Sequence, residues 1–190
     1  MSICDIYAAA GITALPVNPI EAAAAVGVKT VRYSDICGVY CRSMEEMYRE
    51  SRFGFSFEEH GKPVIAVNEN ACGVRRRRFT VAHELGHCVL GHVGKGRRRN
   101  GEEERAADKF AAALLAPASV LRMCEVRSPE ETAQLCGITI SAARIRFSEI
   151  MRGGIGEEDI LIIMRFSGFI DRYLQCKSAK SCHIDIFKRY

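Results

Sequence analysis

One short stretch of alternating hydrophobic residues precedes a long series of helix-like segments, and this order restricts the fold more than any other feature. Residues 53–67, FGFSFEEHGKPVIAV, place apolar side chains at alternate positions on both sides of a turn-forming run at 59–62. This pattern is typical of a β-hairpin. Residues 28–33, VKTVRY, alternate in the same manner. The sequence therefore predicts a small sheet in this part of the chain.

Segments with helical periodicity or capping signals lie on both sides of the hairpin. They occupy the first residues of the chain and then residues 18–26, 43–50, 75–90, 102–115, 117–125, 128–136, 140–151 and 157–166. Helices that follow a small sheet, without further alternating strands, indicate an α+β fold and not a series of βαβ units.

Composition favours a folded chain that works in the cytoplasm. Of the 190 residues, 48% are hydrophobic, which is enough for a core. The longest apolar runs, such as residues 160–164, are too short to cross a bilayer. The first residues lack the basic segment of a secretory signal. The nine cysteines are odd in number, so we expect reduced cysteines that pack as small hydrophobic residues.

Two histidines four positions apart lie on the expected helix 75–90, and Glu84 directly follows the first of them. At about 100° per residue, His83 and His87 share one side of this helix, away from an apolar stripe. The stripe consists of Val81, Leu85, Cys88 and Val89. Two imidazoles one turn apart can reach one metal ion, and Glu84 could accept a proton from a metal-bound water. The motif also arises by chance on ordinary helices, so a third ligand has to decide.

The expected helix 102–115 offers that ligand. Glu104 and Asp108 begin a stripe that is otherwise apolar, and a buried carboxylate without a partner is costly. A zinc ion would be the partner of Glu104, while Asp108 could accept a hydrogen bond from the outer N–H of a ligating histidine. Alternatively, the glutamates at 102–104 only stabilise the helix N-terminus, which leaves Asp108 unexplained. His92 is not expected to be a ligand, because on a continued helix it would point to the opposite side.

Three segments resemble the ImmA/IrrE family of metallopeptidases: PVIAVNEN at 63–70, RRRRFTVAHELGH at 75–87 and ERAADKFAAALLAP at 104–117. A weaker likeness continues over residues 133–150. The resemblance implies a gluzincin-like site in which His83, His87 and Glu104 bind Zn²⁺ and Glu84 is the general base. One departure is Ala106, where the family often has a second acidic residue.

We accordingly predict two regions. Residues 1–125 form a zinc metallopeptidase domain, with a small β-sheet packed on a zincin-like core around the HExxH helix. Residues 126–190 form a mainly helical C-terminal region that is helix-turn-helix-like at 128–150.

The family's known roles imply a protein substrate, namely a helix-turn-helix transcriptional repressor of a bacterium or phage. Its cleavage would release genes of a mobile element or of a stress response. The expected mechanism is metal-assisted peptide hydrolysis, in which Glu84 removes a proton from water and passes it to the leaving amine. The residues considered as donors to the oxyanion are His92, Tyr40 and the arginines at 75–78, and the sequence does not choose among them.

Two other functions stay open at this point. Residues 131–147 read either as a DNA-binding helix-turn-helix, with Arg144 and Arg146 on its second helix, or as a helical hairpin that covers the core. The protein could also use a zinc site to bind a partner with little proteolysis. The basic runs at 75–78 and 95–99 could contact nucleic acid or an acidic partner, or simply face water; no aromatic residues interleave with them, which disfavours single-strand binding. No membrane partner is expected, and the sequence does not indicate an oligomeric state.

Overall fold

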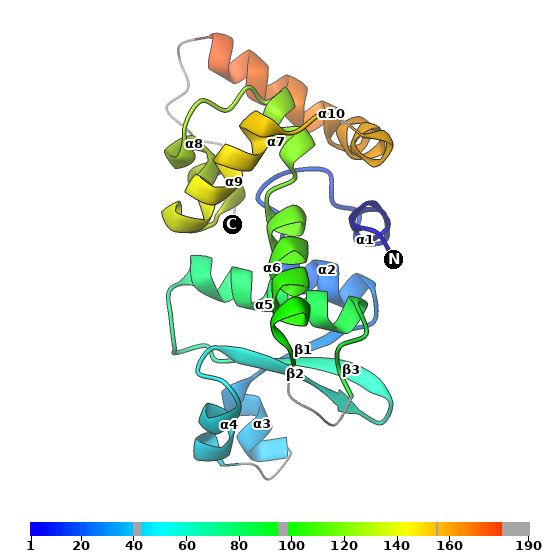
Figure 1. Cartoon of the computed structure of the whole chain (residues 1–190), viewed down its shortest axis with the longest axis vertical. Helices are drawn as coiled ribbons and strands as arrows, with labels where there is room; N and C mark the ends of the chain where they lie inside the picture. The colour runs from blue at the N-terminus through cyan, green and yellow to red at the C-terminus, as the bar shows by residue number, and fades with distance from the viewer. Residues whose placement is uncertain (40–42, 95–98, 155, 180–190) are drawn as a thin grey trace.

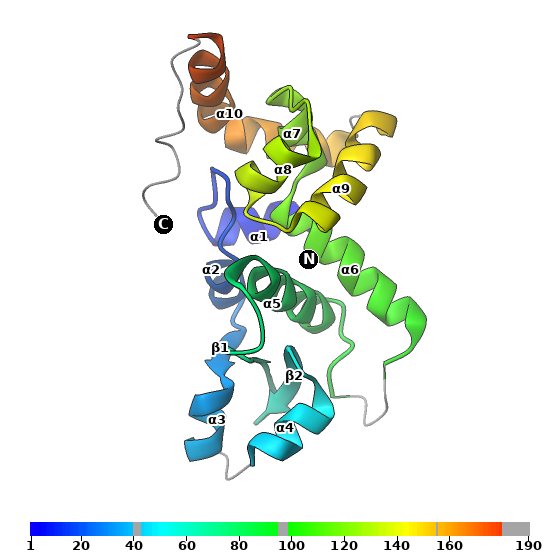
Figure 2. The ribbon, with the colours of Figure 1, turned by 90° about the vertical axis from the view of Figure 1, so that its left-hand side faces the viewer.

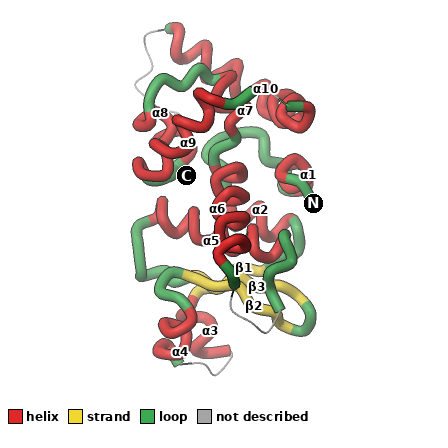
Figure 3. Tube along the Cα trace, viewed as in Figure 1, coloured by secondary structure: helices red, strands yellow, loops and turns green. Residues whose placement is uncertain are grey.

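The computed structural model describes residues 1–39, 43–94, 99–154 and 156–179. Its secondary structure consists of a small sheet and many helices, as the α+β prediction requires (Figures 1 and 3). The elements are α1 (Ile3–Ala9), α2 (Pro19–Ala25), β1 (Lys29–Arg32), α3 (Tyr33–Val39), α4 (Met44–Glu50), β2 (Gly54–Glu59), β3 (Lys62–Val67), α5 (Val74–Val89), α6 (Gly101–Leu115), α7 (Ala118–Met123), α8 (Pro129–Cys136), α9 (Ile140–Arg152) and α10 (Glu157–Ser178).

The sheet has the order β1-β3-β2, with β1 parallel and β2 antiparallel to the central strand β3. Residues 64–67 of β3 are all buried because both faces of this strand are covered. Ile65 belongs to the main core, whereas Ala66 packs in a second cluster with residues of α3 and α4. Ser56 of β2 pairs with Ile65, so Ser56 lies on the face of the sheet that meets the main core.

The main core lies on the side of the sheet that α5 covers, and α3 and α4 cover the opposite face (Figures 1 and 2). The predicted hairpin and the predicted helix at 75–90 are both present, and the helix begins and ends one residue earlier than predicted. Helix α3 was not anticipated, and neither was the parallel pairing of β1 with β3. That pairing joins segments 35 positions apart, such as Lys29 and Val64, which no local pattern specifies.

Two glycines allow the layers around α5 to approach closely. A Cβ atom on Gly86 would lie 3.2 Å from Cα of Ala107 and 3.0 Å from a ring carbon of Phe110, so Gly86 is the point where α6 crosses α5. On the other side, a Cβ on Gly54 would lie 2.7 Å from Cγ2 of Thr80. The small residues at these contacts therefore bring β2, α5 and α6 within reach of one another.

The helices α7 to α10 pack at the end of the molecule away from the sheet, beside α1 (Figures 1 and 2). Helix α10 continues to Ser178 instead of ending near residue 166, because Phe166, Phe169 and Ile170 are buried and hold its second half against the core. No helix among the described residues is long and apolar enough to span a membrane.

One buried cluster contains side chains of α1 and α2 together with side chains of α7 to α10, and so includes residues on both sides of position 125. The division into regions 1–125 and 126–190 stays a prediction. Within the described residues, the cysteines at positions 4, 72, 88, 124, 136 and 176 are free thiols. Burial raises the pKa of both Cys124 and Cys136 to about 12, so these two pack as small hydrophobic side chains.

Candidate metal centre

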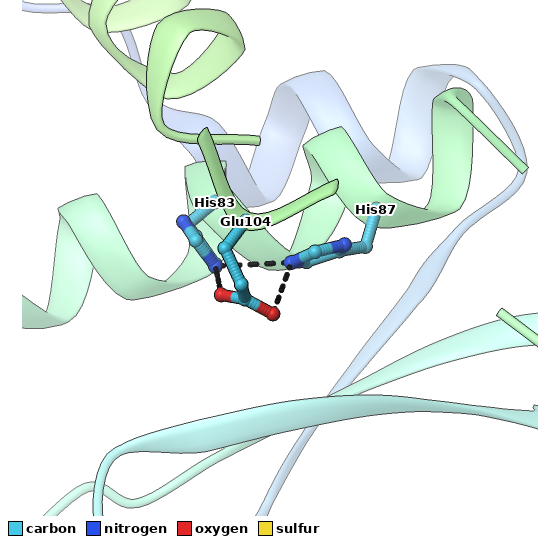
Figure 4. Close-up of side chains that lie close together, drawn as sticks. All are labelled: His83, His87 and Glu104. Atoms are coloured by element: carbon cyan, nitrogen blue, oxygen red, sulfur yellow. Dashed lines mark hydrogen bonds and ion pairs between the residues drawn. The ribbon is translucent and has the colours of Figure 1, made fainter. Parts of the chain in front are cut away.

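Three side chains from two helices bring their polar atoms to one point (Figure 4). His83 and His87 project from α5, and their Nε2 atoms lie 3.1 Å apart. Glu104 comes from the first turns of α6, with Oε2 3.2 Å from Nε2 of His83 and Oε1 3.5 Å from Nε2 of His87. The spacing on α5 follows from the helical repeat, and the position of Glu104 follows from the crossing of α6 at Gly86.

This geometry suits a tetrahedral metal ion. Donor atoms about 2.0–2.1 Å from a tetrahedral zinc ion lie roughly 3.3 Å from one another, and the three observed separations are close to that value. Two imidazole nitrogens and one carboxylate are ligands that zinc accepts readily. Three protein ligands leave a fourth position for water, as catalytic sites of this type require.

Asp108 and His92 contact the outer nitrogens of the two histidines. Nδ1 of His83 lies 2.8 Å from Oδ1 of Asp108, one turn after Glu104 on α6. Nδ1 of His87 lies 3.0 Å from Nδ1 of His92, which stands just beyond α5. Both contacts leave the Nε2 atoms directed toward the shared point, and His92 is not one of the clustered residues.

The two acidic side chains differ from expectation in their exposure. The side chain of Glu104 is 46% exposed and that of Asp108 is 58% exposed, whereas both were expected to be buried. Both side chains line an open groove and do not face the core. The clustering with the histidines, not the cost of burial, therefore accounts for their placement.

His87 is fully buried, and burial lowers its pKa to about 3, with a further contribution from the nearby positive charge of Arg99. The ring is therefore neutral near pH 7. A neutral imidazole keeps the lone pair that a metal ion needs.

The side chain of Glu84 is directed toward strand β2 of the sheet. Its side chain is only 6% exposed. The hydroxyl of Ser56 donates to Oε2 of Glu84 at 2.8 Å, and the Arg99 guanidinium donates to the same oxygen at 2.9 Å. A buried carboxylate next to the histidines is thus held by a strand residue and by the residue before the N-cap of α6.

The cluster opens into a groove of about 1280 Å³. One side of the groove comes from β2 and the residues before it, and another comes from the first turns of α9. On α9, Ile145 is 65% exposed, and Phe79 of α5 also lines the groove. The groove therefore joins the histidine–glutamate cluster to the outer edge of a strand and to an apolar surface.

Comparison with known protein families agrees with this site. The family model Peptidase_M78, described as an IrrE N-terminal-like domain, matches residues 38–148, which is more than half of the chain. The chain belongs to this family. A comparison with curated proteins gives no significant match.

Membership in Peptidase_M78 confirms the resemblance to ImmA/IrrE metallopeptidases and supports a metallopeptidase function. It also implies a metal ion, which the cluster of His83, His87 and Glu104 could bind. The matched region contains all three of these residues together with Glu84 and Asp108.

The arginines at 75–78, one of the peptidase's two basic runs, have separate roles. Arg78 donates to the backbone carbonyls of Val17, Cys136 and Gly137, and so ties α5 to the N-terminal segment and to the turn before α9. Arg77 donates to the carbonyl of Glu69.

Arg76 and Arg75 complete this run. Arg76 lines the groove, with its Cζ atom 4.4 Å from the centre of the Phe53 ring. Arg75 is exposed. Tyr40, the other candidate donor, lies outside the described residues, as does most of the second basic run at 95–99.

The contact of Arg99 with Glu84 was missed at the level of the sequence. Arg99 is the one described residue of the second basic run, and that run was considered only as a surface for nucleic acid or an acidic partner. The only local signal was its position directly before Asn100, the N-cap of α6, which places Arg99 close in sequence to Glu104.

The helical hairpin α8–α9 is packed as a cover of the core. Leu135, Ile138 and Ala143 are buried in it. Arg146 donates to the carbonyl of Ala116 at 2.7 Å and pairs with Glu149, so its guanidinium is engaged within the protein. These contacts favour the packing interpretation over DNA readout by this helix.

Cys88 lies one turn after Glu84. Burial raises the pKa of its thiol to about 12. A thiol with so high a pKa is a poor nucleophile at neutral pH, so simple packing explains Cys88 better than redox control of the site does.

Proposed function

We propose that this peptidase is a zinc-dependent endopeptidase in which His83, His87 and Glu104 bind the metal ion and Glu84 is the general base. The observation that carries the proposal is the convergence of two imidazole nitrogens and a carboxylate, all within 4.8 Å of one another, beside a buried glutamate. Asp108 supports the arrangement through Nδ1 of His83, which fixes the ring and increases its basicity.

A bound zinc ion would lower the pKa of a coordinated water and polarise the carbonyl of the scissile bond. Glu84 would accept a proton from the attacking water and transfer it to the nitrogen of the leaving amine. His87 stays neutral because it is buried, so it does not compete for this proton near pH 7.

The proposed substrate is a helix-turn-helix transcriptional repressor, cleaved at one site in an extended segment. Strand β2 is at the edge of the described sheet and lines the groove, so an extended peptide could bind along it. Ile145 and Phe79 offer an apolar surface in the same groove, which suits a hydrophobic side chain near the cleaved bond. Cleavage in the cytoplasm would derepress genes of a mobile element or a stress response.

The direct test begins with the adjacent gene: where it encodes a small helix-turn-helix repressor, that repressor is co-expressed with the peptidase. We expect the wild-type chain to convert the repressor into two fragments, whose masses locate the cleaved bond. Glu84→Gln should leave the repressor intact while the purified variant still contains about one zinc ion per chain. His83→Ala should lose both cleavage and metal, because it removes a ligand.

The same experiment separates the partner-binding alternative from the peptidase. A regulator that acts by binding would inactivate the repressor without fragments, and Glu84→Gln would not change this effect. Repressor processing that survives Glu84→Gln would therefore contradict the proposed mechanism. Absence of metal after zinc supplementation would contradict both metal-dependent functions.

A further inference from the structure

The environment of Glu84 suggests that a side chain outside the HExxH motif is needed for its action. A glutamate on a helix has three rotatable bonds, so its carboxylate must be held if it is to meet one particular water. Here both hydrogen bonds described above end on Oε2. Oε1 takes neither of them.

The three side chains form a connected network. The Arg99 guanidinium spans the network, with Nη1 2.9 Å from Oε2 of Glu84 and Nη2 2.6 Å from Oγ of Ser56. Since arginine only donates, Oγ of Ser56 must accept from Arg99, and its own hydrogen is then directed to Glu84. A second contact of Nη2 with the backbone carbonyl of Ser56, at 3.3 Å, attaches the guanidinium to β2.

The position of Arg99 in the chain links this network to the metal cluster. Arg99 directly precedes Asn100, the N-cap of α6, and Glu104 follows in the first turns of that helix. The segment that carries Arg99 to Glu84 is therefore continuous with the helix that carries Glu104 to the histidines. Its side chain is 20% exposed and lines the groove, so it is partly shielded from water.

We propose that Arg99 is a positioning residue for Glu84, acting directly and through the hydroxyl of Ser56. It holds Oε2 so that Oε1 is the oxygen that exchanges the proton with water. The catalytic part of this inference rests on the proposed function, in which Glu84 is the general base. The contact between Arg99 and Glu84 can be tested without an activity assay.

The first measurement is a thermal double-mutant cycle on metal-free protein. Arg99→Ala should lower the melting temperature by several degrees, because it leaves the buried carboxylate without its charged partner. In the Glu84→Gln background the same change should cost less than half as much. Arg105→Ala, which removes an exposed arginine of α6 outside the groove, should have no comparable effect. Equal shifts of Arg99→Ala in both backgrounds would overturn the proposal.

The second measurement uses the same repressor, purified and fluorescently labelled, as the substrate in a kinetic assay. Arg99→Ala should reduce kcat roughly 10–100-fold, with KM within about twofold and the zinc content unchanged. Free guanidinium ion, at a non-denaturing concentration, should restore part of the lost kcat in Arg99→Ala and none in Glu84→Gln. Ser56→Ala should cause a smaller loss, since Arg99 still reaches Glu84 directly.

The outcomes distinguish this inference from the proposed function. An active wild-type enzyme whose kcat is unaffected by Arg99→Ala would overturn the positioning role and leave the peptidase intact. A loss of kcat without guanidinium rescue, together with a loss of zinc, would mean that Arg99 only supports the fold, and this also overturns the inference. A wild-type protein that binds zinc but cleaves nothing would contradict the proposed function, and the thermal cycle would then decide the contact by itself.

Discussion

Replacing Asp108 by alanine is expected to weaken zinc binding about tenfold while the fold stays intact. The carboxylate lies 2.8 Å from Nδ1 of His83, so the change removes the partner that fixes this ring with Nε2 toward the metal. Loss of such a partner typically costs 10–100-fold in metal affinity. The side chain is 58% exposed, and water can partly replace it, which places the effect near the lower limit.

The assay is competition for zinc with a chromophoric chelator at pH 7 and fixed ionic strength. Glu102→Ala is the matched control, because it removes an exposed negative charge from the same helix outside the metal cluster. Asp108→Asn should lie between wild type and Asp108→Ala, since an amide oxygen still accepts a hydrogen bond. An affinity of Asp108→Ala within twofold of wild type, or an equal loss in Glu102→Ala, would refute the reasoning.

Three further predictions concern the scaffold of the site. Gly86→Ala should destabilise the metal-free protein by about 1 kcal/mol in urea denaturation, because overpacking against Ala107 costs about 2 kcal/mol and exceeds the helix-propensity gain of about 1 kcal/mol. Zinc affinity should fall as well. Unchanged stability would contradict the close crossing of α5 and α6. Because the folded pKa of His87 is about 3 and the unfolded value about 6.5, the unfolded state binds the extra proton below pH 6.5. Stability of the metal-free protein should therefore fall by up to about 2 kcal/mol between pH 6.5 and 5, and an identical pH profile in His87→Asn would argue against this assignment. Arg78→Ala should lower the free energy of unfolding by about 3 kcal/mol through its lost hydrogen bonds to carbonyls, whereas Arg75→Ala should change it by less than about 0.5.

The elements themselves were largely readable from the sequence. The hairpin turn, the helix of the two histidines and the cap-rich starts of α6, α8 and α9 all follow from local patterns, since period, capping and turn residues act over a few positions. Helix α3 was missed because it begins at Tyr33 directly after β1, without a capping residue between them. The second half of α10 was missed because it is held by packing of Phe169 and Ile170, which is a tertiary effect.

The candidate site divides in a similar way. The relation of His83 to His87 is fixed by one turn of helix, so the sequence alone placed them together. Glu104 and Asp108 were assigned to the site because they begin an otherwise apolar helical stripe, and the family resemblance implied the same role for Glu104. Their separation from each other is again one helical turn. Their exposure was judged wrongly, because a stripe on a helical wheel does not reveal whether its end reaches the core or a groove.

By itself, the sequence determined an α+β chain with a paired-histidine helix and an acidic helix that could complete a metal site. Only the tertiary structure decided how closely these parts approach, through Gly86 against Ala107. It also decided that Arg99 and Ser56, 43 positions apart, meet on Glu84. Periodicity acts along one element, whereas contacts between elements depend on the packing of the whole core. The partners of the proposed general base therefore could not be read from the chain alone.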